Sequence, residues 1–370
     1  MEQEDLVRAV NKIHASAELR TKAISGQPAP RRNPAYAPLF KGAVCLAAVA
    51  VIAVGIFAVP KILKPVVSVA PASQGSSTEG TGSKANTANG LYQDSEIQNI
   101  LVLGLDGQKG DTARSDSMMI LSIDKRHSKL KVTSLLRDMY VRFEDPNMDN
   151  RLNAAYTLGG APLAVKTVEN NFGFRIDNYV TVDYGGFEKM IDRIGGVTID
   201  VTEPEAKLIN QYSGEAASKR ITAGSVLLTG KQALYYSRIR MIDTDFGRTE
   251  RQRKVVISIV NKLKSSGTAT ALSVVQDIFP SVTTDMKKDA LIGLVKDSFT
   301  FLKYPILQSR LPADNTYKCE NVREMAVLVP DIQANKQAVM KFVYDVNVEF
   351  PEQPKNTSGS SVISESKPVK

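Results

Sequence analysis

The chain has 370 residues, of which 43% are hydrophobic and 23% are charged, and its formal net charge is +8. These values are ordinary for a globular protein, and the length allows one large domain or two smaller ones. Nucleic-acid binding would need a known motif or aromatic residues interleaved with a basic face, and the sequence shows neither. We therefore expect no nucleic-acid partner.

Residues 43–60 (AVCLAAVAVIAVGIFAVP) carry no charge, and the run is long enough to cross a bilayer as a helix. Cationic residues are denser before this segment than after it, which predicts a cytoplasmic N-terminus. A cleaved signal peptide or a buried core helix fits less well, given the long preceding region and the polar stretch that follows. We predict a cytoplasmic tail at 1–41, a transmembrane signal anchor at 42–60, and a cell-membrane protein whose remaining chain is extracellular.

Residues 71–93 and 351–370 are rich in small and polar residues, which is typical of flexible segments. We therefore expect a linker at 61–93, a disordered tail at 350–370 and one domain at 94–349. Cys319 is the only cysteine of the expected extracellular part, since Cys45 lies in the anchor, so no disulfide can form within that domain.

Short apolar runs predict strands at 97–106, 117–124 and 130–137. Helical and strand patterns then alternate, with strands expected at 179–183 and 197–201. Helices are expected at 161–172, 187–194, 231–236, 249–265, 269–278, 288–302 and 335–346, and residues 249–252 (TERQ) fit a capping box. This alternation predicts a layered α/β/α domain with a central mixed β-sheet, preceded by one transmembrane helix.

Five arginines lie within residues 238–253. Arg248 and Gln252 share a helical register with apolar residues at 256, 259 and 263, so we expect them on the inward face near the helix start. Arg238 and Arg240 point to one side if their segment is extended. A buried arginine needs an anionic partner, and the guanidinium fork suits phosphate oxygens.

A structural network is the alternative for these arginines, with carboxylates of the same stretch, Asp243, Asp245 and Glu250, as the partners. The sequence leaves both interpretations open.

Two aspartates are placed to bind a metal ion, Asp106 at the end of the first strand and Asp116 just before the second. Carboxylates at neighbouring strand ends can converge, and Mg²⁺ commonly binds one or two of them together with substrate phosphates. Both could instead be turn residues that accept backbone hydrogen bonds. The chain has only two histidines, so a Ser-His-Asp triad or a histidine zinc site is disfavoured.

Six segments together resemble the LytR–CpsA–Psr family of bacterial cell-envelope proteins. They are residues 99–106 (NILVLGLD), 114–117 (RSDS), 133–138 (TSLLRD), 152–156 (LNAAY) with Gly159 and Gly160, 179–187 (YVTVDYGGF), and 238–240 (RIR) with 245–252 (DFGRTERQ). The match covers about residues 97–265. It departs mildly at Leu136, where the family often has proline, and at Ser117, where threonine is common.

The resemblance implies an extracellular phosphotransferase that moves an anionic glycopolymer, such as wall teichoic acid or capsule, from a polyprenyl-pyrophosphate carrier to peptidoglycan. It implies Mg²⁺ or Mn²⁺ at Asp106 and Asp116. The other site residues that it implies are the catalytic group Arg137, Arg238, Arg240 and Arg248, and the substrate-binding group Arg114, Asp245, Arg251 and Gln252. All of these arginines except Arg251, together with Gln252, would hold the pyrophosphate. A membrane-anchored regulator that binds polyprenyl phosphates without turnover is the alternative function, and the proton acceptor is left unassigned between Asp138 and Asp245.

Overall fold

The computed structural model describes residues 86–88, 90–106, 114–278, 281–287, 300–301 and 303–347, with the backbone alone described for 86–88 and 266–278. By its contacts the chain divides into residues 1–40 and residues 41–370, and all elements below belong to the second unit. None of the described helices is long and apolar enough to cross a membrane. The predicted anchor at 42–60 lies outside the described residues.

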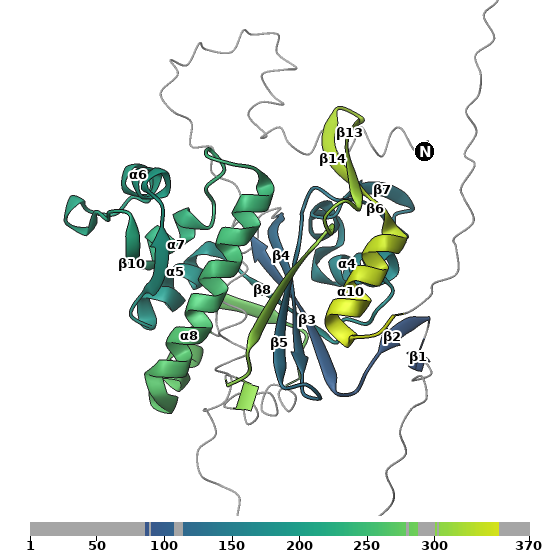
Figure 1. Ribbon diagram of the computed structural model, residues 1–370, viewed down its shortest axis with the longest axis horizontal. Helices are drawn as coiled ribbons and strands as arrows, with labels where there is room; N and C mark the ends of the chain where they lie inside the picture. Colours follow the sequence, from purple (N-terminus) through teal and green to yellow (C-terminus); the bar gives the residue numbers. More distant parts are fainter. Residues whose placement is uncertain are drawn as a thin grey trace, which may run out of the picture. The chain divides into compact units, whose positions relative to one another are not determined.

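A six-stranded mixed sheet forms the centre of the domain, in the order β11-β8-β3-β4-β5-β12 (Figure 1). Its strands are β3 (Ile97–Leu105), β4 (Ser115–Asp124), β5 (Lys129–Leu135), β8 (Asn178–Val182), β11 (Val282–Thr284) and β12 (Ile306–Leu311). β3, β5, β8 and β12 run in one direction, whereas β4 and β11 run against them. The expected mixed sheet is confirmed.

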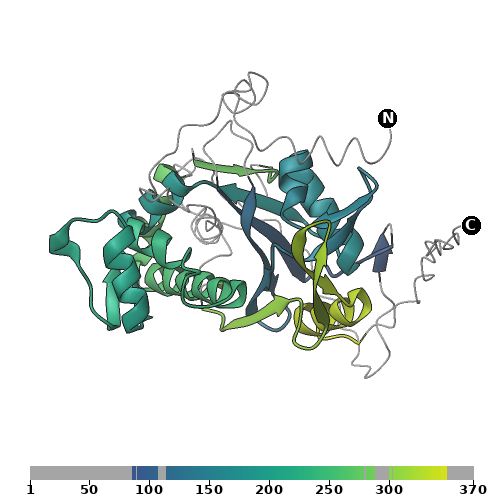
Figure 2. The same cartoon turned by 90° about the horizontal axis from the view of Figure 1, so that it is seen from above.

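Helices cover both faces of this sheet, because alternate strand residues point to opposite sides. Ile100 and Val102 of β3 pack into one core, and Leu101 and Leu103 pack into the other. The first core is completed by α5 (Tyr184–Arg193), α7 (Gly230–Tyr236) and α8 (Asp245–Ile278), and the second by α4 (Ala154–Phe172) and α10 (Ile332–Tyr344). Figure 2 shows the same layers from above.

The smaller elements lie outside the main sheet. They are the pairs β1 (Asn86–Ala88) with β2 (Leu91–Gln93), β6 (Tyr140–Phe143) with β7 (Met148–Arg151), β9 (Val197–Val201) with β10 (Gly224–Leu228), and β13 (Tyr317–Val322) with β14 (Met325–Pro330), together with helix α6 (Glu203–Tyr212) and the 3-10 turn η1 (Ala217–Lys219). Tyr92 of β2 is buried and packs edge-on against Tyr344, so the packed core includes a residue upstream of the predicted boundary at 94.

The long helix α8 corrects two expectations. It is continuous over 34 residues, where separate helices were expected at 249–265 and 269–278. It also begins at Asp245, so the predicted capping box at Thr249 is wrong: the Thr249 hydroxyl donates to the Phe246 carbonyl within the helix, at 2.8 Å. Most of the expected helix at 288–302 lies outside the described residues.

Candidate functional site

The site residues converge at one edge of the central sheet, where the strands of the majority direction end. Asp106 follows β3, Arg137 follows β5 and Tyr184 follows β8, while Asp116 stands at the start of the opposed strand β4. Carboxyl ends of parallel strands are the usual ligand-binding edge of α/β sheets. The convergence that the sequence predicted for Asp106 and Asp116 therefore has its origin in the strand directions.

A β-bulge sets the position of Asp116. Gly104 of β3 pairs with Ser117 and Leu105 pairs with Ser115, so Asp116 is the extra residue between them. Bulges of this kind re-aim side chains and are frequent beside active sites. Beyond the bulge, Asp106 donates its backbone N–H to the Arg114 carbonyl at 3.0 Å, and its Oδ1 accepts the Arg114 backbone N–H at 2.6 Å.

The Asp116 carboxylate is buried and only half satisfied. Its Oδ1 accepts from Arg137 Nη1 at 2.8 Å and from Asn153 Nδ2 at 3.3 Å. Its Oδ2 has no hydrogen-bond partner in the described part of the chain. A buried carboxylate oxygen without a donor is costly, so this atom is suited to a cation supplied from outside the protein.

Arg137 lies between three carboxylates. Besides Asp116, its Nε is 3.5 Å from Asp138 Oδ2 and 3.9 Å from Asp245 Oδ1. Burial lowers the pKa of Arg137, but the carboxylates of Asp116, Asp138 and Asp245 outweigh it and leave the pKa raised. This guanidinium therefore stays charged at any pH at which the protein is folded.

Arg248 is the most deeply buried charge of the site. Its side chain has 0% exposure, and Nη2 donates to Asp245 Oδ2 at 2.7 Å. Its Nε and Nη1 have no acceptor among the described residues. The inward position predicted from the spacing of Arg248 with Gln252 is confirmed, since Gln252 is 1% exposed.

Arg240 also faces Asp245, with its Nη2 at 3.6 Å from Oδ1. Its Nε and Nη2 are buried atoms that make no hydrogen bond within the described structure. Burial and the like charge of Arg137 lower the pKa of Arg240. Arg240 and Arg248 thus both face the Asp245 carboxylate, and the described residues offer too few acceptors for all of their N–H groups.

Asp245 stands at the first position of α8 and is shared by Arg137, Arg240 and Arg248. Burial raises its pKa to about 6, because desolvation outweighs the attraction of Arg137 and Arg240. The carboxyl therefore titrates close to neutral pH, which suits a group that exchanges a proton during a reaction.

Two further predicted residues surround this centre. The Arg238 guanidinium lies over the Tyr184 ring at 4.7 Å. Gln252 accepts from the Ser117 hydroxyl at 2.8 Å and donates to the Ser237 carbonyl at 3.4 Å. Gln252 therefore joins the strand that carries Asp116 to the segment that carries Arg238, and both ends of its amide are used by the protein.

Arg251 has different partners from the other arginines. It donates twice to Asp243, at 2.7 and 2.6 Å, and also contacts Glu205 at 3.3 Å and the Ile239 carbonyl at 2.7 Å. This is the structural network that the sequence left open, although Glu205 from α6 takes the place of the expected Glu250. The predicted substrate-binding role of Arg251 has no support from these contacts.

The arrangement favours a phosphate-bearing ligand. Buried polar atoms in proteins are almost always hydrogen-bonded, yet nitrogens of Arg240 and Arg248 have no acceptor among the residues that the structure describes. Planar guanidinium groups match phosphate oxygens in geometry as well as in charge. The site is therefore built to complete its hydrogen bonds with an anion.

Comparisons with known proteins show the family of this chain. A model of the LytR_cpsA_psr family matches residues 66–341. The chain is also 33% identical, over 269 residues, to a protein of Oceanobacillus iheyensis named polyisoprenyl-teichoic acid–peptidoglycan teichoic acid transferase TagU, covering 70% of this chain and 80% of that protein. The chain belongs to the LytR–CpsA–Psr family.

Solved structures of the LytR–CpsA–Psr family share this fold. One is described as TagT bound to LIIa-WTA, with a TM-score of 0.57 and 23% identity over 68% of this chain and 92% of that one. Another, YwtF (TagT) with bound octaprenyl pyrophosphate lipid, has a TM-score of 0.53 and 23% identity over 68% of this chain and 91% of that one.

The residues of this LytR–CpsA–Psr domain fit a divalent cation. No group of three or more His, Cys, Asp or Glu side chains that could hold a metal occurs in the described regions. Mg²⁺ does not need one, since it commonly binds one or two carboxylates and completes its shell with water and substrate phosphates. The unsatisfied Oδ2 of Asp116, close in register to Asp106, is the kind of ligand required.

Sequence reasoning missed three contributors to the site. Asn153 supports the Asp116 carboxylate, and Tyr184 stacks on Arg238. Both lie within segments already noted for their family resemblance, at 152–156 and 179–187, which was the available signal. The third is the hairpin β13–β14, whose residues carry no motif and whose proximity to Asp138 depends on the fold.

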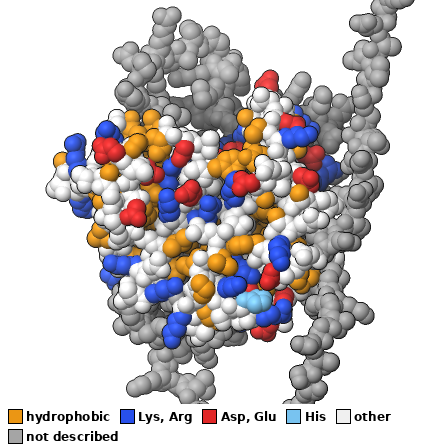
Figure 3. Space-filling view, viewed as in Figure 1, with side chains coloured by type: hydrophobic (Ala, Val, Ile, Leu, Met, Phe, Trp, Pro, Cys, Tyr) orange, Lys and Arg blue, Asp and Glu red, His pale blue; other side chains and the backbone are white. Residues whose placement is uncertain are grey.

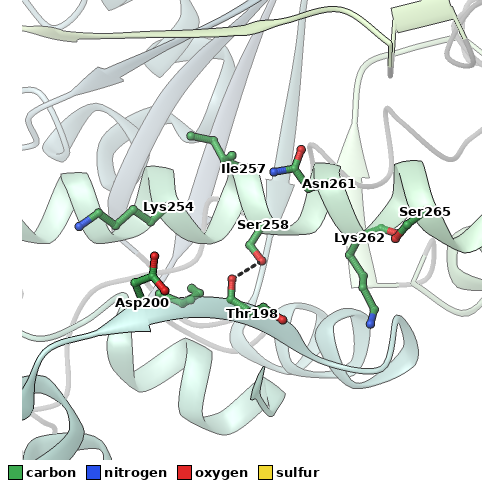
Figure 4. Close-up of a pocket in the computed structure, with 9 residues that line it drawn as sticks. Thr198, Asp200, Lys254, Ile257, Ser258, Asn261, Lys262 and Ser265 are labelled. Atoms are coloured by element: carbon green, nitrogen blue, oxygen red, sulfur yellow. Dashed lines mark hydrogen bonds between the residues drawn. The ribbon is translucent and has the colours of Figure 1, made fainter. Parts of the chain in front are cut away.

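Two features away from the arginine site are the charge of the surface and a cavity beside α8. On the face shown in Figure 3, basic and acidic side chains are interspersed. A cavity of about 630 Å³ lies between β9 and α8, with Thr198 and Asp200 on the strand side and Lys254 and Lys262 on the helix (Figure 4). The Ser258 hydroxyl donates to the Thr198 carbonyl across it, at 2.9 Å. This cavity shares no residue with the arginine site.

Proposed function

We propose that this chain transfers a teichoic acid or similar anionic glycopolymer from a polyprenyl-pyrophosphate carrier to peptidoglycan, forming a phosphodiester. The observation that carries the proposal is the fully buried Arg248, with two nitrogens that lack acceptors in the described structure. The names of the relatives support the substrate class. TagU of O. iheyensis is named for teichoic acid transfer to peptidoglycan, and the TagT structure for its bound octaprenyl pyrophosphate lipid.

In the proposed reaction, an acceptor hydroxyl attacks the phosphorus nearest the sugar. The bond from that phosphorus to the bridging oxygen breaks, and polyprenyl phosphate leaves with the bonding electrons. Negative charge builds on the non-bridging and leaving oxygens. Arg137, Arg240 and Arg248 are fixed cations around that position, so they stabilise the charge without having to reorganise.

Asp245 is our candidate for the group that accepts the hydroxyl proton. Its pKa of about 6 keeps a useful fraction ionised at neutral pH, and it contacts the arginines that would hold the phosphate. Asp138 is the runner-up, since it also lies against Arg137. The proton that leaves the hydroxyl thus stays on a carboxylate of the site until water removes it.

We further propose that Asp106 and Asp116 hold Mg²⁺, or Mn²⁺ in its place. A divalent cation bound there would neutralise phosphate charge as a Lewis acid. The Asp116 Oδ2, which has no donor in the described part of the chain, supports this assignment. Arg137 holds the other oxygen of the same carboxylate and so fixes its orientation.

For localisation, we propose a single-pass membrane protein with residues 42–60 as the anchor and the catalytic domain outside the cell. The uncharged run and the excess of cationic residues before it support this topology. A reporter enzyme that is active only outside the cytoplasm is expected to work when fused after residue 370 and to fail when fused after residue 40. The opposite pattern would contradict the proposed topology.

The function is tested with the full chain in detergent, a synthetic polyprenyl-pyrophosphate-linked oligosaccharide and peptidoglycan as acceptor. We expect polyprenyl phosphate to be released in step with covalent attachment of the sugar to peptidoglycan. Binding of the lipid without release of polyprenyl phosphate, at any Mg²⁺ concentration, would favour the alternative of a non-catalytic binding or regulatory protein.

A further inference from the structure

A second cavity opens directly on the arginine site. It has a volume of about 470 Å³ and lies between the start of α8 and the hairpin β13–β14. One wall consists of Asp138 with residues 244–246, and the other consists of residues 319–321 and 326–328 of the hairpin. Asp138 and Asp245 belong both to this cavity and to the group around Arg137, so a molecule held here reaches the reacting centre.

The hairpin wall is hydrogen-bonded to the segment that carries Arg137 and Asp138. The Leu328 backbone N–H donates to the Asp138 carbonyl at 3.0 Å, immediately after Arg137. Arg151 reinforces the join, because its Nη2 donates to the Ala326 carbonyl at 2.7 Å and its Nε lies 3.5 Å from Asp138 Oδ1. The width of the cavity is therefore set by the residues that hold the site together.

The opposite wall is fixed as well. Phe246 lies next to Asp245, and its ring packs against the Tyr317 ring with centroids 5.5 Å apart. The Arg310 guanidinium covers Phe246 at 4.4 Å. These two contacts make Phe246 a fixed part of the wall rather than a movable lid.

The cavity and the arginine site differ in charge. The cavity is lined by three carboxylates, Asp138, Asp245 and Glu320, and by no lysine or arginine among its lining residues. Arginines next to the cavity offset the charges of Asp138 and Asp245, so Glu320 carries most of the negative charge of the lining, and a neutral sugar or an ammonium group suits it better than an anionic polymer does. The phosphates of the donor therefore belong with the arginines, and this cavity suits the other substrate.

Resting on the function proposed above, we infer that this cavity is the acceptor site. The peptidoglycan sugar that carries the attacking hydroxyl lies beside Asp138 and Asp245, against residues 319–321 and 326–328 of the hairpin, and a free amine of its attached peptide faces Glu320. Phosphoryl transfer needs the attacking and leaving oxygens roughly in line. A cavity that shares Asp245 with the arginines brings the hydroxyl to the same phosphorus and places its proton beside that carboxylate.

The first test uses a muramyl disaccharide–peptide acceptor with a free amine, and the same acceptor with the amine acetylated. In the wild type, acetylation is expected to raise the acceptor KM about threefold, within the range of an exposed ion pair, because Glu320 is exposed. In Glu320→Gln this difference should vanish, while the donor KM stays unchanged. Glu324→Gln is the matched control, since Glu324 lies in the turn of the same hairpin but does not line the cavity.

The second test uses Cys319, which lines the cavity and is exposed. Cys45 is the only other cysteine, so the full chain with Cys45→Ser carries one thiol. Excess acceptor should slow alkylation of Cys319, and a bulky maleimide on Cys319 should block transfer while binding of the polyprenyl-pyrophosphate donor is retained. Cys319→Ser should transfer at the same rate with and without maleimide treatment, so a loss seen only in the protein with the thiol comes from the adduct.

The outcomes separate the two proposals. No transfer by the wild type with any acceptor would overturn the proposed function. Transfer that proceeds while acceptor leaves Cys319 alkylation unchanged, with equal effects of acetylation in wild type and Glu320→Gln, would overturn the acceptor site alone. Melting curves of each variant identify any loss of fold.

Discussion

Arg248 and Arg251 lie three residues apart on α8, and the two guanidinium groups differ in how many acceptors meet them. Arg251 is held by both oxygens of Asp243, by Glu205 and by the Ile239 carbonyl. Arg248 contacts one carboxylate, that of Asp245, which Arg137 and Arg240 also approach. Residue type and burial are the same in both cases, so the count of acceptors is what distinguishes them.

This difference separates structure from function within one helix. Both terminal nitrogens of Arg251 donate to acceptors of the folded chain, and only its Nε lacks one among the described residues, so removing Arg251 leaves carboxylates unpaired. An arginine with unused donors, such as Arg248, is a cost to the empty protein that a ligand can offset. The comparison therefore predicts opposite effects of the same substitution at the two positions.

The largest expected effect is that of Arg248→Met on catalysis. Transfer should fall roughly 100-fold or more, the usual loss when one donor to a developing negative charge is removed. Stability of the ligand-free protein should hold or rise, because an apolar side chain of similar volume replaces a buried, half-paired charge. Steady-state transfer rates and thermal melting without ligand check both parts. A clear loss of stability with normal transfer would mean that Arg248 has a structural role, as Arg251 does.

Arg251→Met should show the reverse pattern. The change leaves Asp243 and the buried Glu205 without their cation, and the unfolding free energy is expected to fall by roughly 3 kcal/mol, the lower end for a broken buried pair because Asp243 is a third exposed. Transfer per folded molecule should be nearly unchanged at a temperature well below the melting point. Denaturant unfolding and single-turnover rates give the two quantities, and a selective loss of donor affinity would contradict the assignment.

The substitution Asp116→Asn tests whether this carboxylate binds the metal ion. The amide keeps the shape but removes the charge of the oxygen that has no donor in the described structure, so the Mg²⁺ concentration for half-maximal transfer should rise about tenfold. Asp149→Asn is the control, because that carboxylate is exposed on β7 and pairs only with Arg142 in the salt bridges found. Identical Mg²⁺ titrations for wild type and Asp116→Asn would show that Asp116 does not bind the metal and is only a turn residue.

The contribution of Asp245 to stability depends on pH. Its pKa is raised to about 6 by burial, above the ordinary value of 3.8, so its contribution to stability is full below about pH 4 and is lost as the pH rises through 6. In Asp245→Asn this pH dependence of the melting temperature should disappear. Inorganic pyrophosphate should bind more tightly to the variant at pH 7, since one negative charge is gone, while transfer falls because the proposed proton acceptor is missing. Weaker pyrophosphate binding would show that Asp245 mainly orients the arginines.

Much of the site could be predicted because its signals are local. The inward position of Arg248 follows from its helical spacing with Gln252, and the strand ends at Asp106 and Asp116 follow from the apolar runs beside them. The different fate of Arg251 depends on Glu205, which is 46 residues away in the chain and comes close only through packing. Strand β13 is largely exposed, β14 is partly buried, and neither shows a clear alternation, so nothing in the sequence of this hairpin indicates that it borders the site.

The smallest expected effect concerns Tyr184, which Arg238 covers at 4.7 Å. A stacked guanidinium gains about 0.5–1 kcal/mol from an aromatic face at a partly exposed position. Tyr184→Leu should therefore weaken donor binding only about threefold, by letting Arg238 leave its position, and should change kcat little. Tyr184→Phe keeps the ring and should behave as the wild type, which separates stacking from any role of the hydroxyl. Donor KM values for the three proteins, measured at saturating acceptor, decide the matter. A tenfold loss of donor affinity in Tyr184→Phe would mean that the hydroxyl itself contacts the substrate, and Arg238 would then resemble neither Arg251, which carboxylates hold, nor Arg248, whose free donors we assign to the ligand.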